Sequence, residues 1–387
     1  MSDAAADIIW MQRALHLAER GLFSTTPNPR VGCVLVKDGQ SVGEGWHPGA
    51  GQPHAEVFAL NAAGLAATGA TAYVTLEPCS HFGRTPPCAD ALIAAGVARV
   101  VVGCEDPNPL VAGAGIARLR AAGIDVTSGV LADQAEGLNL GFMQRMRTGL
   151  PWVRAKLAHS IDGRTAMESG ESFWITGAPA RADVQYWRAR SCALITGADT
   201  LLMDQARMQV RLDLLAQRWP DHPAVLSPLR GVVDSRLRVP ADHPFYAVDR
   251  AMLFTGNGHS VAQLDAYRAR GVAVVTCASN GDHLDLLALL RRLVEAHAVN
   301  EVMIEAGAEL TGAFYRAGLI QELILYCAPR LLGSAGRPLM ALPLDTMADA
   351  VTLDVLDRRQ FGADQRIIAR LHGKSSHPTD EVQAIKR

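Results

Sequence analysis

The sequence predicts two α/β domains, and three observations support this fold class. The chain has 387 residues, more than a single hydrophobic core usually serves. Short apolar runs typical of strands alternate with helical patterns in both halves. Between the halves, Gly149 and Pro151 interrupt regular structure. We therefore expect one domain at 1–148 and another at 149–372, followed by a polar and disordered tail at 373–387.

The first half is predicted to be a three-layer α/β domain with mostly parallel central strands. Residues 30–47 have the pattern of a hairpin in which Asp38 and Gly39 supply the turn. A helix follows from His54, and alternating elements continue to the end of this half. These elements are a strand at 71–76, a helix from about Ala89, a strand at 98–104, a helix near 115–122 and a strand at 124–128. A basic, turn-containing segment at 142–152 is expected to separate the halves.

The second half is predicted to be another α/β domain. Its expected strands are 152–160, 192–197, 229–234, 251–256, 272–277, 300–306 and 322–329, with helices at 181–191 and 284–298 and a terminal hairpin around Gly362. Gly307 follows a strand and precedes a helix, where backbone N–H groups could hold a phosphate, although a simple turn is the commoner use. A full G-x-G-x-x-G pattern is missing, so a standard dinucleotide-binding fold is not predicted.

The composition is that of a globular protein and excludes several classes of function. Hydrophobic residues make up 49% of the chain and charged residues 20%, with a formal net charge of −2. This charge argues against a general nucleic-acid binder, which normally carries a basic face. Neither a signal peptide nor an apolar run of ~20 residues is found, so no membrane association is expected. Seven cysteines, an odd number, argue against a disulfide framework and indicate the cytoplasm.

Four residues of the first half have the chemistry of a metal-dependent deaminase. His54 and Glu56 lie two positions apart at the head of a helix, and Cys79 and Cys88 follow the strand at 71–76. Catalytic zinc usually takes three nitrogen or sulfur ligands and leaves one position for water, whose pKa it lowers. Glu56 is then placed to move a proton between this water and a leaving amine. This pattern is typical of zinc deaminases that act on nucleobases.

Two features leave alternatives open at this point. Eight residues separate Cys79 from Cys88, whereas the usual signature has two, so one cysteine could be a small buried hydrophobe. Both cysteines adjoin prolines in a polar loop, which favours ligands over core residues. The same ligand set also accepts iron.

Three stretches of the first half resemble the deaminase half of the bifunctional deaminase/reductases of riboflavin biosynthesis. They are residues 26–60, 69–97 and 106–115. In this family an eight-residue spacing between the cysteines is normal. The resemblance implies a cytidine-deaminase-like fold and five residues that position the substrate, namely Asn28, His47, His81, Arg84 and Asn108.

Four of these five residues also have an ordinary structural explanation. Asn28 lies between two prolines and could shape a turn. His47 and His81 could be surface histidines, and the loop containing Asn108 could simply end a strand. Arg84 is the stronger substrate contact, because it lies in the loop between the two cysteine ligands.

The resemblance continues through the second half to about Leu371. It rests on the stretches at 156–176, 184–202, 232–235, 304–319 and 328–333. It implies a dihydrofolate-reductase-like fold that uses NADPH, with Lys156 beside the reacting centre. The implied NADPH contacts are Ala158, Trp174, Thr200, Asp204, Ser235 and Gly307. The implied contacts to the phosphorylated substrate are Ser172, Arg188, Met208, Arg211 and Glu305, of which the arginines suit phosphate because a guanidinium binds it in a fork.

One loop of the second half departs from the family pattern. Residues 204–211 read DQARMQVR, so Gln205 and Ala206 stand where the family usually has aspartate and proline. Loss of the proline gives the loop more conformational freedom. The contacts of this loop are therefore expected to differ from the family pattern at Gln205 and Ala206.

The sequence as a whole predicts a two-step enzyme of riboflavin synthesis that binds zinc and NADPH, acts on small phosphorylated pyrimidines and forms a homo-oligomer. Two alternatives remain. One is a cytidine or tRNA-adenosine deaminase with an unrelated second domain, against which stand the cysteine spacing and the lack of a basic face. The other treats the second half as a non-catalytic nucleotide-sensing module, because of its altered loop.

Overall fold

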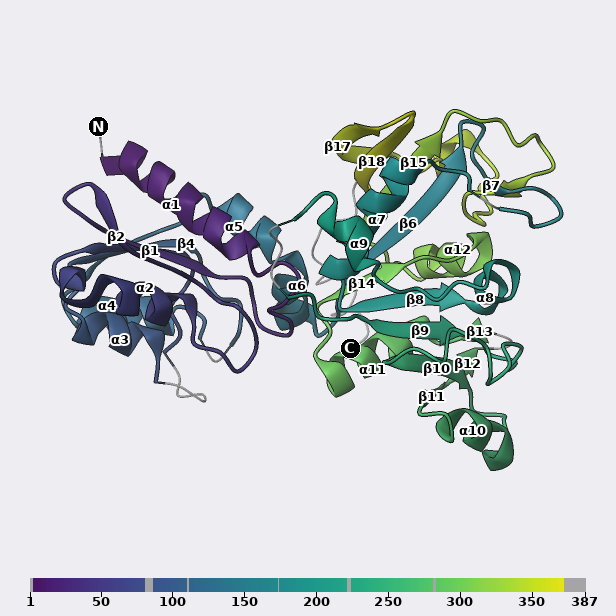
Figure 1. The fold of residues 1–387 in the computed structure, drawn as a ribbon, viewed down its shortest axis with the longest axis horizontal. Coiled ribbons are helices and arrows are strands. Elements are labelled where there is room, and N and C mark those ends of the chain that lie inside the picture. The colour runs from purple at the N-terminus through teal and green to yellow at the C-terminus, as the bar shows by residue number, and fades with distance from the viewer. Residues whose placement is uncertain are drawn as a thin grey trace. The chain divides into compact units, whose positions relative to one another are not determined.

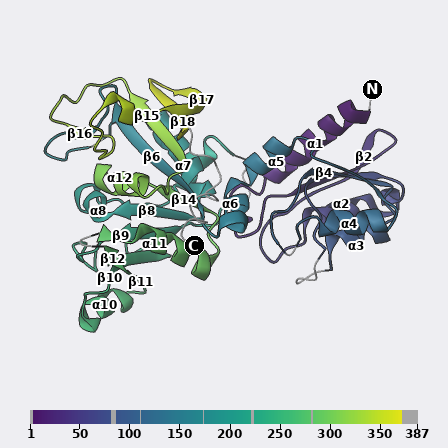
Figure 2. The same ribbon diagram turned by 180° about the vertical axis from the view of Figure 1, so that it is seen from behind.

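The chain divides into two compact units (Figure 1 and Figure 2). The computed structural model describes residues 3–80, 86–109, 111–172, 174–220, 224–280 and 283–371. The first unit comprises Met1–Gly149 with His222–Leu226, and the second comprises Leu150–Asp221 with Ser227–Arg387. Within the described residues, no helix is both long and apolar enough to span a membrane. The expected tail at 373–387 lies outside the described residues.

The first unit contains a five-stranded sheet with the order β2-β1-β3-β4-β5. β1 and β2 form the predicted hairpin, whose turn residues Asp38 and Gly39 have φ angles of 51° and 74°. Two consecutive positive φ angles give a turn whose twist matches that of the paired strands. The strands are β1 (Gly32–Lys37), β2 (Gln40–Trp46), β3 (Thr71–Leu76), β4 (Arg99–Cys104) and β5 (Asp125–Ser128).

The expectation of mostly parallel strands is confirmed for this sheet, in which only β1 runs against the direction of the other four strands. β3, β4 and β5 pair in parallel, but β1 is antiparallel to both β2 and β3. The reason lies in the order of connections. The hairpin reverses the chain between β1 and β2, and the helical crossover that follows returns β3 in the direction of β2 on the far side of β1.

Helices cover both faces of the sheet, so this unit has three layers (Figure 1). Met11 of α1 packs with Val101 on one face. Ala59 of α2, Leu92 of α3 and Leu119 of α4 pack on the other. These helices are α1 (Asp3–Glu19), α2 (Ala55–Ala63), α3 (Cys88–Ala94) and α4 (Ala114–Ala121), with a short 3-10 turn η1 (Gly64–Ala67) after α2.

Two helices that close the first unit are not predicted from the sequence. They are α5 (Ala132–Leu138) and α6 (Leu140–Thr148), and both contribute to the core beneath α1. Most of the segment at 142–152, expected to be a turn-containing separator, is therefore helical. Its breaker Gly149 stands at the helix end with a φ of 73°, the position where glycine commonly terminates a helix.

Two glycines of β2 set how closely α2 approaches the sheet. A Cβ atom on Gly43 would lie 2.2 Å from the carbonyl oxygen of Ala59, and one on Gly45 would lie 2.3 Å from that of Ala55. No larger residue fits at either position without moving the helix. The glycines of β2 therefore fix the depth of α2, the helix that carries Glu56 and begins at His54.

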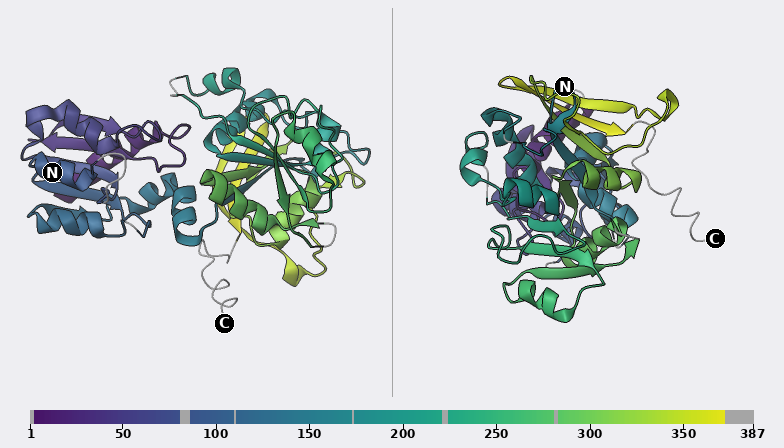
Figure 3. Two further views of the ribbon diagram at one scale, coloured as in Figure 1. Left: turned by 90° about the horizontal axis from the view of Figure 1, so that it is seen from below. Right: turned by 90° about the vertical axis from the view of Figure 1, so that its right-hand side faces the viewer.

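The second unit is built on a nine-stranded sheet with the order β11-β10-β9-β8-β14-β6-β15-β18-β17 (Figure 1). Seen from below, its strands lie in the middle of the unit with helices around them (Figure 3). The strands from β11 to β15 are parallel, and β18 pairs antiparallel with both β15 and β17. The expected strands and the terminal hairpin are confirmed. They are β6 (Trp152–Ser160), β8 (Ala193–Gly197), β9 (Leu229–Val233), β10 (Ala251–Gly256), β11 (Ala273–Cys277), β14 (Glu301–Ile304), β15 (Glu322–Ala328), β17 (Leu353–Phe361) and β18 (Asp364–Leu371).

Helices also pack on both faces of this sheet. Leu289 of α11 and Phe314 of α12 belong to one core, whereas Trp187 of α7 and Tyr267 of α10 belong to the other. The helices are α7 (Ala178–Arg190), α8 (Ala198–Asp204), α9 (Leu212–Ala216), α10 (Val261–Arg268), α11 (Leu286–His297), α12 (Ala308–Arg316) and the 3-10 turn η2 (Met347–Asp349). Two small sheets pair β7 (Arg164–Ala166) with β16 (Arg337–Pro338) and β12 (Ser279–Asn280) with β13 (His283–Leu284).

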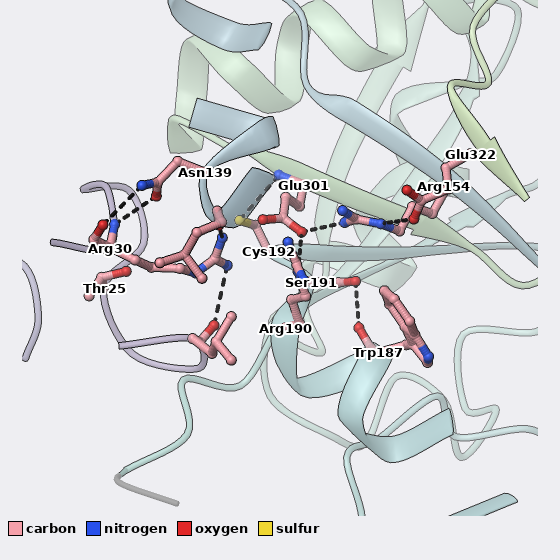
Figure 4. A network of polar contacts seen from close by, with 12 residues as sticks. Thr25, Arg30, Asn139, Arg154, Trp187, Arg190, Ser191, Cys192, Glu301 and Glu322 are labelled. Carbon is pink, nitrogen blue, oxygen red and sulfur yellow. Dashed lines mark hydrogen bonds and ion pairs between the residues drawn. The ribbon is translucent and has the colours of Figure 1, made fainter. Parts of the chain in front are cut away.

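Buried polar networks stabilise each unit (Figure 4). In the first unit, the backbone N–H of Arg30 donates to the side chain of Asn139 at 2.8 Å, and that side chain donates back to the Arg30 carbonyl at 2.9 Å. In the second, the guanidinium of Arg154 binds the carboxylates of both Glu301 and Glu322. All three of these charged groups are buried, and pairing offsets the cost of removing them from water.

Candidate active sites

The three expected metal ligands meet where three elements of the first unit begin or end. His54 is the residue before α2, Cys79 follows β3, and Cys88 is the first residue of α3. The His54 Nδ1 atom lies 3.3 Å from the sulfur of Cys88 and 3.7 Å from that of Cys79. All three ligand atoms lie within 4.8 Å of one another. One nitrogen and two sulfur donors at this spacing fit a catalytic zinc site.

The thiols of this cluster interact strongly with each other. A hydrogen bond from Cys88 lowers the pKa of Cys79 well below the ordinary value of a thiol, with His54 acting in the same direction. The same interaction raises the pKa of Cys88. The cluster therefore favours a thiolate at Cys79, which is the form that binds metal. The alternative that one cysteine serves only as a core residue is wrong, because both sulfurs face the histidine.

Glu56 lies beside this cluster in the first turn of α2. Its side chain is 3% exposed, and its Oε2 atom has no hydrogen-bond partner among the described residues. Burial raises the pKa of the carboxyl, while the charge of His54 opposes that shift. A buried carboxylate oxygen without a partner is costly, so it is expected where a ligand or water completes the site. Glu56 is thus suited to accept and return a proton.

Asn28 and His47 form a short polar chain next to the metal ligands. The Asn28 side-chain amide lies 3.0 Å from His47 Nε2, and His47 Nδ1 lies 3.0 Å from the carbonyl of Pro53. The rings of His47 and His54 are 5.4 Å apart. The alternative that His47 is a surface histidine is wrong, because it is 2% exposed.

The remaining expected deaminase residues are only partly described. Asn108 lies in the loop between β4 and α4, and its backbone N–H donates to Asp106 Oδ1 at 2.8 Å. His81 and Arg84 lie outside the described residues. Their expected contacts with substrate stay predictions.

The second unit contains a cavity of about 590 Å³. It lies among residues from β6, α7, α8 and the start of α12. Eleven of the twelve residues expected in the reductase site line it, while Ser235, which is also described, does not. These eleven are Lys156, Ala158, Ser172, Trp174, Arg188, Thr200, Asp204, Met208, Arg211, Glu305 and Gly307.

The cavity concentrates positive charge around one carboxylate. Glu305 accepts from Arg188 Nε at 2.6 Å and lies 3.6 Å from Lys156 Nζ. Burial lowers the pKa of Lys156, opposed by the charge of Glu305. Burial also lowers the pKa of Arg211, and the nearby charge of Arg188 acts in the same direction. Lys156, Arg188 and Arg211 thus outnumber the one carboxylate of Glu305 in this part of the cavity, which suits an anionic group such as a phosphate.

The loop that departs from the family pattern is held at the edge of this cavity. Gln205 ends α8 with a φ of 47°, and Met208 has a φ of 53° and is 3% exposed. Arg188 Nη1 donates to the carbonyl of Gln209, while the Arg211 N–H donates to the side chain of Gln185, both at 2.9 Å. Side-chain contacts to the backbone thus order a loop that lacks the usual proline.

Some cavity residues are missed from the sequence. Arg181 and Gln185 of α7 and Arg337 of β16 all line the cavity. Arg181 and Gln185 lie seven and three positions before Arg188, the spacing that places residues on one helix face. That periodicity could have identified them once Arg188 was assigned, whereas no local signal marks Arg337.

The fold and the two sites define a class of protein: a zinc-dependent deaminase joined to a second catalytic α/β domain. Residues 5–104 match the cytidine and deoxycytidylate deaminase zinc-binding region, and residues 151–364 match the RibD C-terminal domain. The chain belongs to the RibD family of bifunctional deaminase/reductases of riboflavin biosynthesis.

Relatives match the chain over nearly its whole length. The riboflavin biosynthesis protein RibD of Escherichia coli K12 is 49% identical, covering 92% of this chain and 97% of the relative. The solved Acinetobacter baumannii RibD, form 1, is 46% identical with a TM-score of 0.86, covering 95% and 99% of the two chains. A Thermotoga maritima deaminase/reductase is 29% identical with a TM-score of 0.83, covering 96% and 100%. Both alternatives for the second half, an unrelated domain and a non-catalytic module, are therefore wrong.

Proposed function

We propose that the first unit removes the C2 amino group of 2,5-diamino-6-ribosylamino-4(3H)-pyrimidinone 5′-phosphate. The observation that carries this proposal is the unpartnered carboxylate oxygen of Glu56 beside the His54, Cys79 and Cys88 cluster. Zinc held by these three side chains would supply the acidity that lets a water molecule lose a proton near neutral pH. Glu56 takes that proton and returns it to the amino group as ammonia leaves.

Five residues are proposed to position the pyrimidine and its phosphate: Asn28, His47, His81, Arg84 and Asn108. The place of Asn28 and His47 next to His54 supports this assignment for two of them. The Nδ1–H group of His47 donates to the carbonyl of Pro53, which leaves Nε2 as an acceptor in the neutral ring. His47 therefore orients the side-chain amide of Asn28, which donates to Nε2.

The second unit is proposed to reduce the ribosyl group of 5-amino-6-(5-phosphoribosylamino)uracil to a ribityl chain. NADPH bound in the cavity would supply the hydride to C1′. Arg188 and Arg211 bind the substrate phosphate, and Lys156 with Glu305 lies beside the reacting carbon. Ser172 and Met208 are further substrate contacts. The proposed cofactor contacts in the cavity are Ala158, Trp174, Thr200, Asp204 and Gly307, and Ser235 is proposed as a further contact outside the cavity lining.

Two broader proposals accompany these reactions. A cytoplasmic location is favoured by the seven cysteines, all of which are free, because thiolate ligands persist in reducing compartments. A homo-oligomer is also proposed, and light scattering of the purified protein tests it directly.

A coupled assay tests the proposed reactions. Zinc-loaded protein is mixed with the diaminopyrimidine ribosyl phosphate and NADPH, and ammonia and NADPH absorbance are followed together. Ammonia should appear before NADPH is consumed, and Glu56→Gln should stop both signals. Ammonia release with constant NADPH would refute the proposed reductase substrate or cofactor. Failure to release ammonia would refute the deaminase substrate.

A further inference from the structure

Glu77 is a buried carboxylate with an unusual set of partners. It is 3% exposed and lies between the end of β3 and the metal ligand Cys79. Its Oε2 accepts from the backbone N–H groups of Asp106 at 3.2 Å and Gly113 at 3.0 Å. Its Oε1 accepts from those of Gly115 at 2.9 Å and Ile116 at 3.1 Å. In the described chain no Lys or Arg pairs with it, so backbone amides alone stabilise the charge.

These four hydrogen bonds connect two segments of the deaminase site. One is the turn from Glu77 to Cys79, and the other is the loop from Asp106 into the start of α4. The second segment contains Asn108, whose backbone N–H is in turn bound by the Asp106 carboxylate at 2.8 Å. Glu77 thus restrains the Asn108 loop at both of its ends, with only Pro78 between it and a metal ligand.

A glycine makes this close approach possible. A Cβ atom on Gly115 would lie 2.0 Å from the carbonyl oxygen of Pro78, closer than any real contact. The first turn of α4 therefore packs directly on the backbone that carries Cys79. The two segments are held together by packing as well as by hydrogen bonds to Glu77.

We propose that Glu77 is a positioning residue for deamination, which fixes the Asn108 loop relative to the metal ligand Cys79. It touches neither the metal cluster nor substrate, and it acts through Asn108. This inference rests on the proposed contact between Asn108 and the substrate. Removing the charge of Glu77 should therefore weaken substrate binding while leaving the three ligands able to hold zinc.

The test uses the zinc-loaded full chain with Glu77→Gln, Asn108→Ala and the double variant. A glutamine keeps the size of the side chain but turns an NH2 group toward two N–H donors. We expect Glu77→Gln to raise KM for ammonia release roughly tenfold, with kcat changed less than about threefold, since hydrogen bonds to a charged group are lost. Zinc content should stay at one per chain. The double variant should be no worse than Asn108→Ala alone, because coupled residues are not additive.

Controls separate this role from general destabilisation. Asp90→Asn removes another carboxylate bound to α4, through Arg118 at the surface, and should leave KM unchanged. Hydrogen exchange of the amides at 113–116 should accelerate at least about tenfold in Glu77→Gln only. Unchanged KM, multiplicative effects in the double variant, or a normal KM in Asn108→Ala alone would each overturn the inference. If the wild-type protein releases no ammonia, the proposed function is refuted instead. In that case the inference is still overturned if hydrogen exchange of the amides at 113–116 is unchanged in Glu77→Gln.

Discussion

Lys156 Nζ lies 3.6 Å from Glu305 Oε2 inside the cavity of the second unit. Arg188 binds the same carboxylate at 2.6 Å, so a single carboxylate lies against two cations. The side chains are 17%, 10% and 16% exposed, in the order lysine, glutamate and arginine. The group keeps one excess positive charge for an anionic ligand, at a site where desolvation would otherwise favour neutral side chains.

Replacing Glu305 with glutamine should affect only the second unit. The change leaves Lys156 and Arg188 largely buried without their carboxylate. Breaking such a buried ion pair lowers the free energy of unfolding by about 3 kcal/mol. We expect NADPH oxidation to fall at least about tenfold while ammonia release is retained. The coupled assay and urea unfolding measure the two effects. Asp265→Asn, which breaks an exposed pair with Arg268, should change neither, and a fully active Glu305→Gln protein would contradict the prediction.

The Glu305 carboxylate should stabilise the fold near neutral pH and lose this effect in acid. Burial opposes its ionisation, but the charges of Arg188 and Lys156 lower its pKa to about 2, against an ordinary value of 4.5. Because the folded-state pKa is depressed, this contribution is present above about pH 4.5 and is lost as the pH falls toward 2. Urea unfolding of wild type and Glu305→Gln between pH 6 and 2.5 should show a stability difference that shrinks in acid. A constant difference would argue against this pKa.

Removal of zinc should separate the two activities. The His54, Cys79 and Cys88 cluster belongs to the first unit, and every residue lining the cavity belongs to the second. Dialysis against a chelator should abolish ammonia release, while NADPH oxidation on the deaminated intermediate continues, and added zinc should restore the first activity. Ammonia release from metal-free protein would show that the cluster does not hold the catalytic ion.

The residues that could be predicted from the sequence are those whose chemistry is local. His54 and Glu56 are two positions apart, and Cys79 follows a strand closely, so spacing and residue type identify them. The hairpin turn at Asp38 and Gly39 was predictable for the same reason, since both residues tolerate a positive φ.

Residues whose role depends on distant partners could not be found in this way. Glu77 reads as an ordinary loop residue, because its four N–H partners lie 29 to 39 positions later in the chain. Likewise, α6 is not predicted, because Phe142 and Met143 are buried against a core that they share with α1, which is distant in the sequence. Similarly, the place of β1 between β2 and β3 in the sheet depends on the whole connection from β2 to β3.

The buried guanidinium of Arg230 provides the last prediction. It donates to the carbonyls of Arg207 at 2.8 Å, Phe245 at 2.9 Å and Asp249 at 2.9 Å, and is 2% exposed. Arg207 adjoins Met208 in the loop that lines the cavity, so Arg230→Met should give this loop more freedom. We expect the free energy of unfolding to fall by at least about 2 kcal/mol. The reductase KM should rise by a larger factor than that by which kcat falls. Arg230→Lys keeps three donors and should recover part of the effect. Ammonia release should be unchanged, and a wild-type KM in Arg230→Met would show that the loop is ordered without this residue.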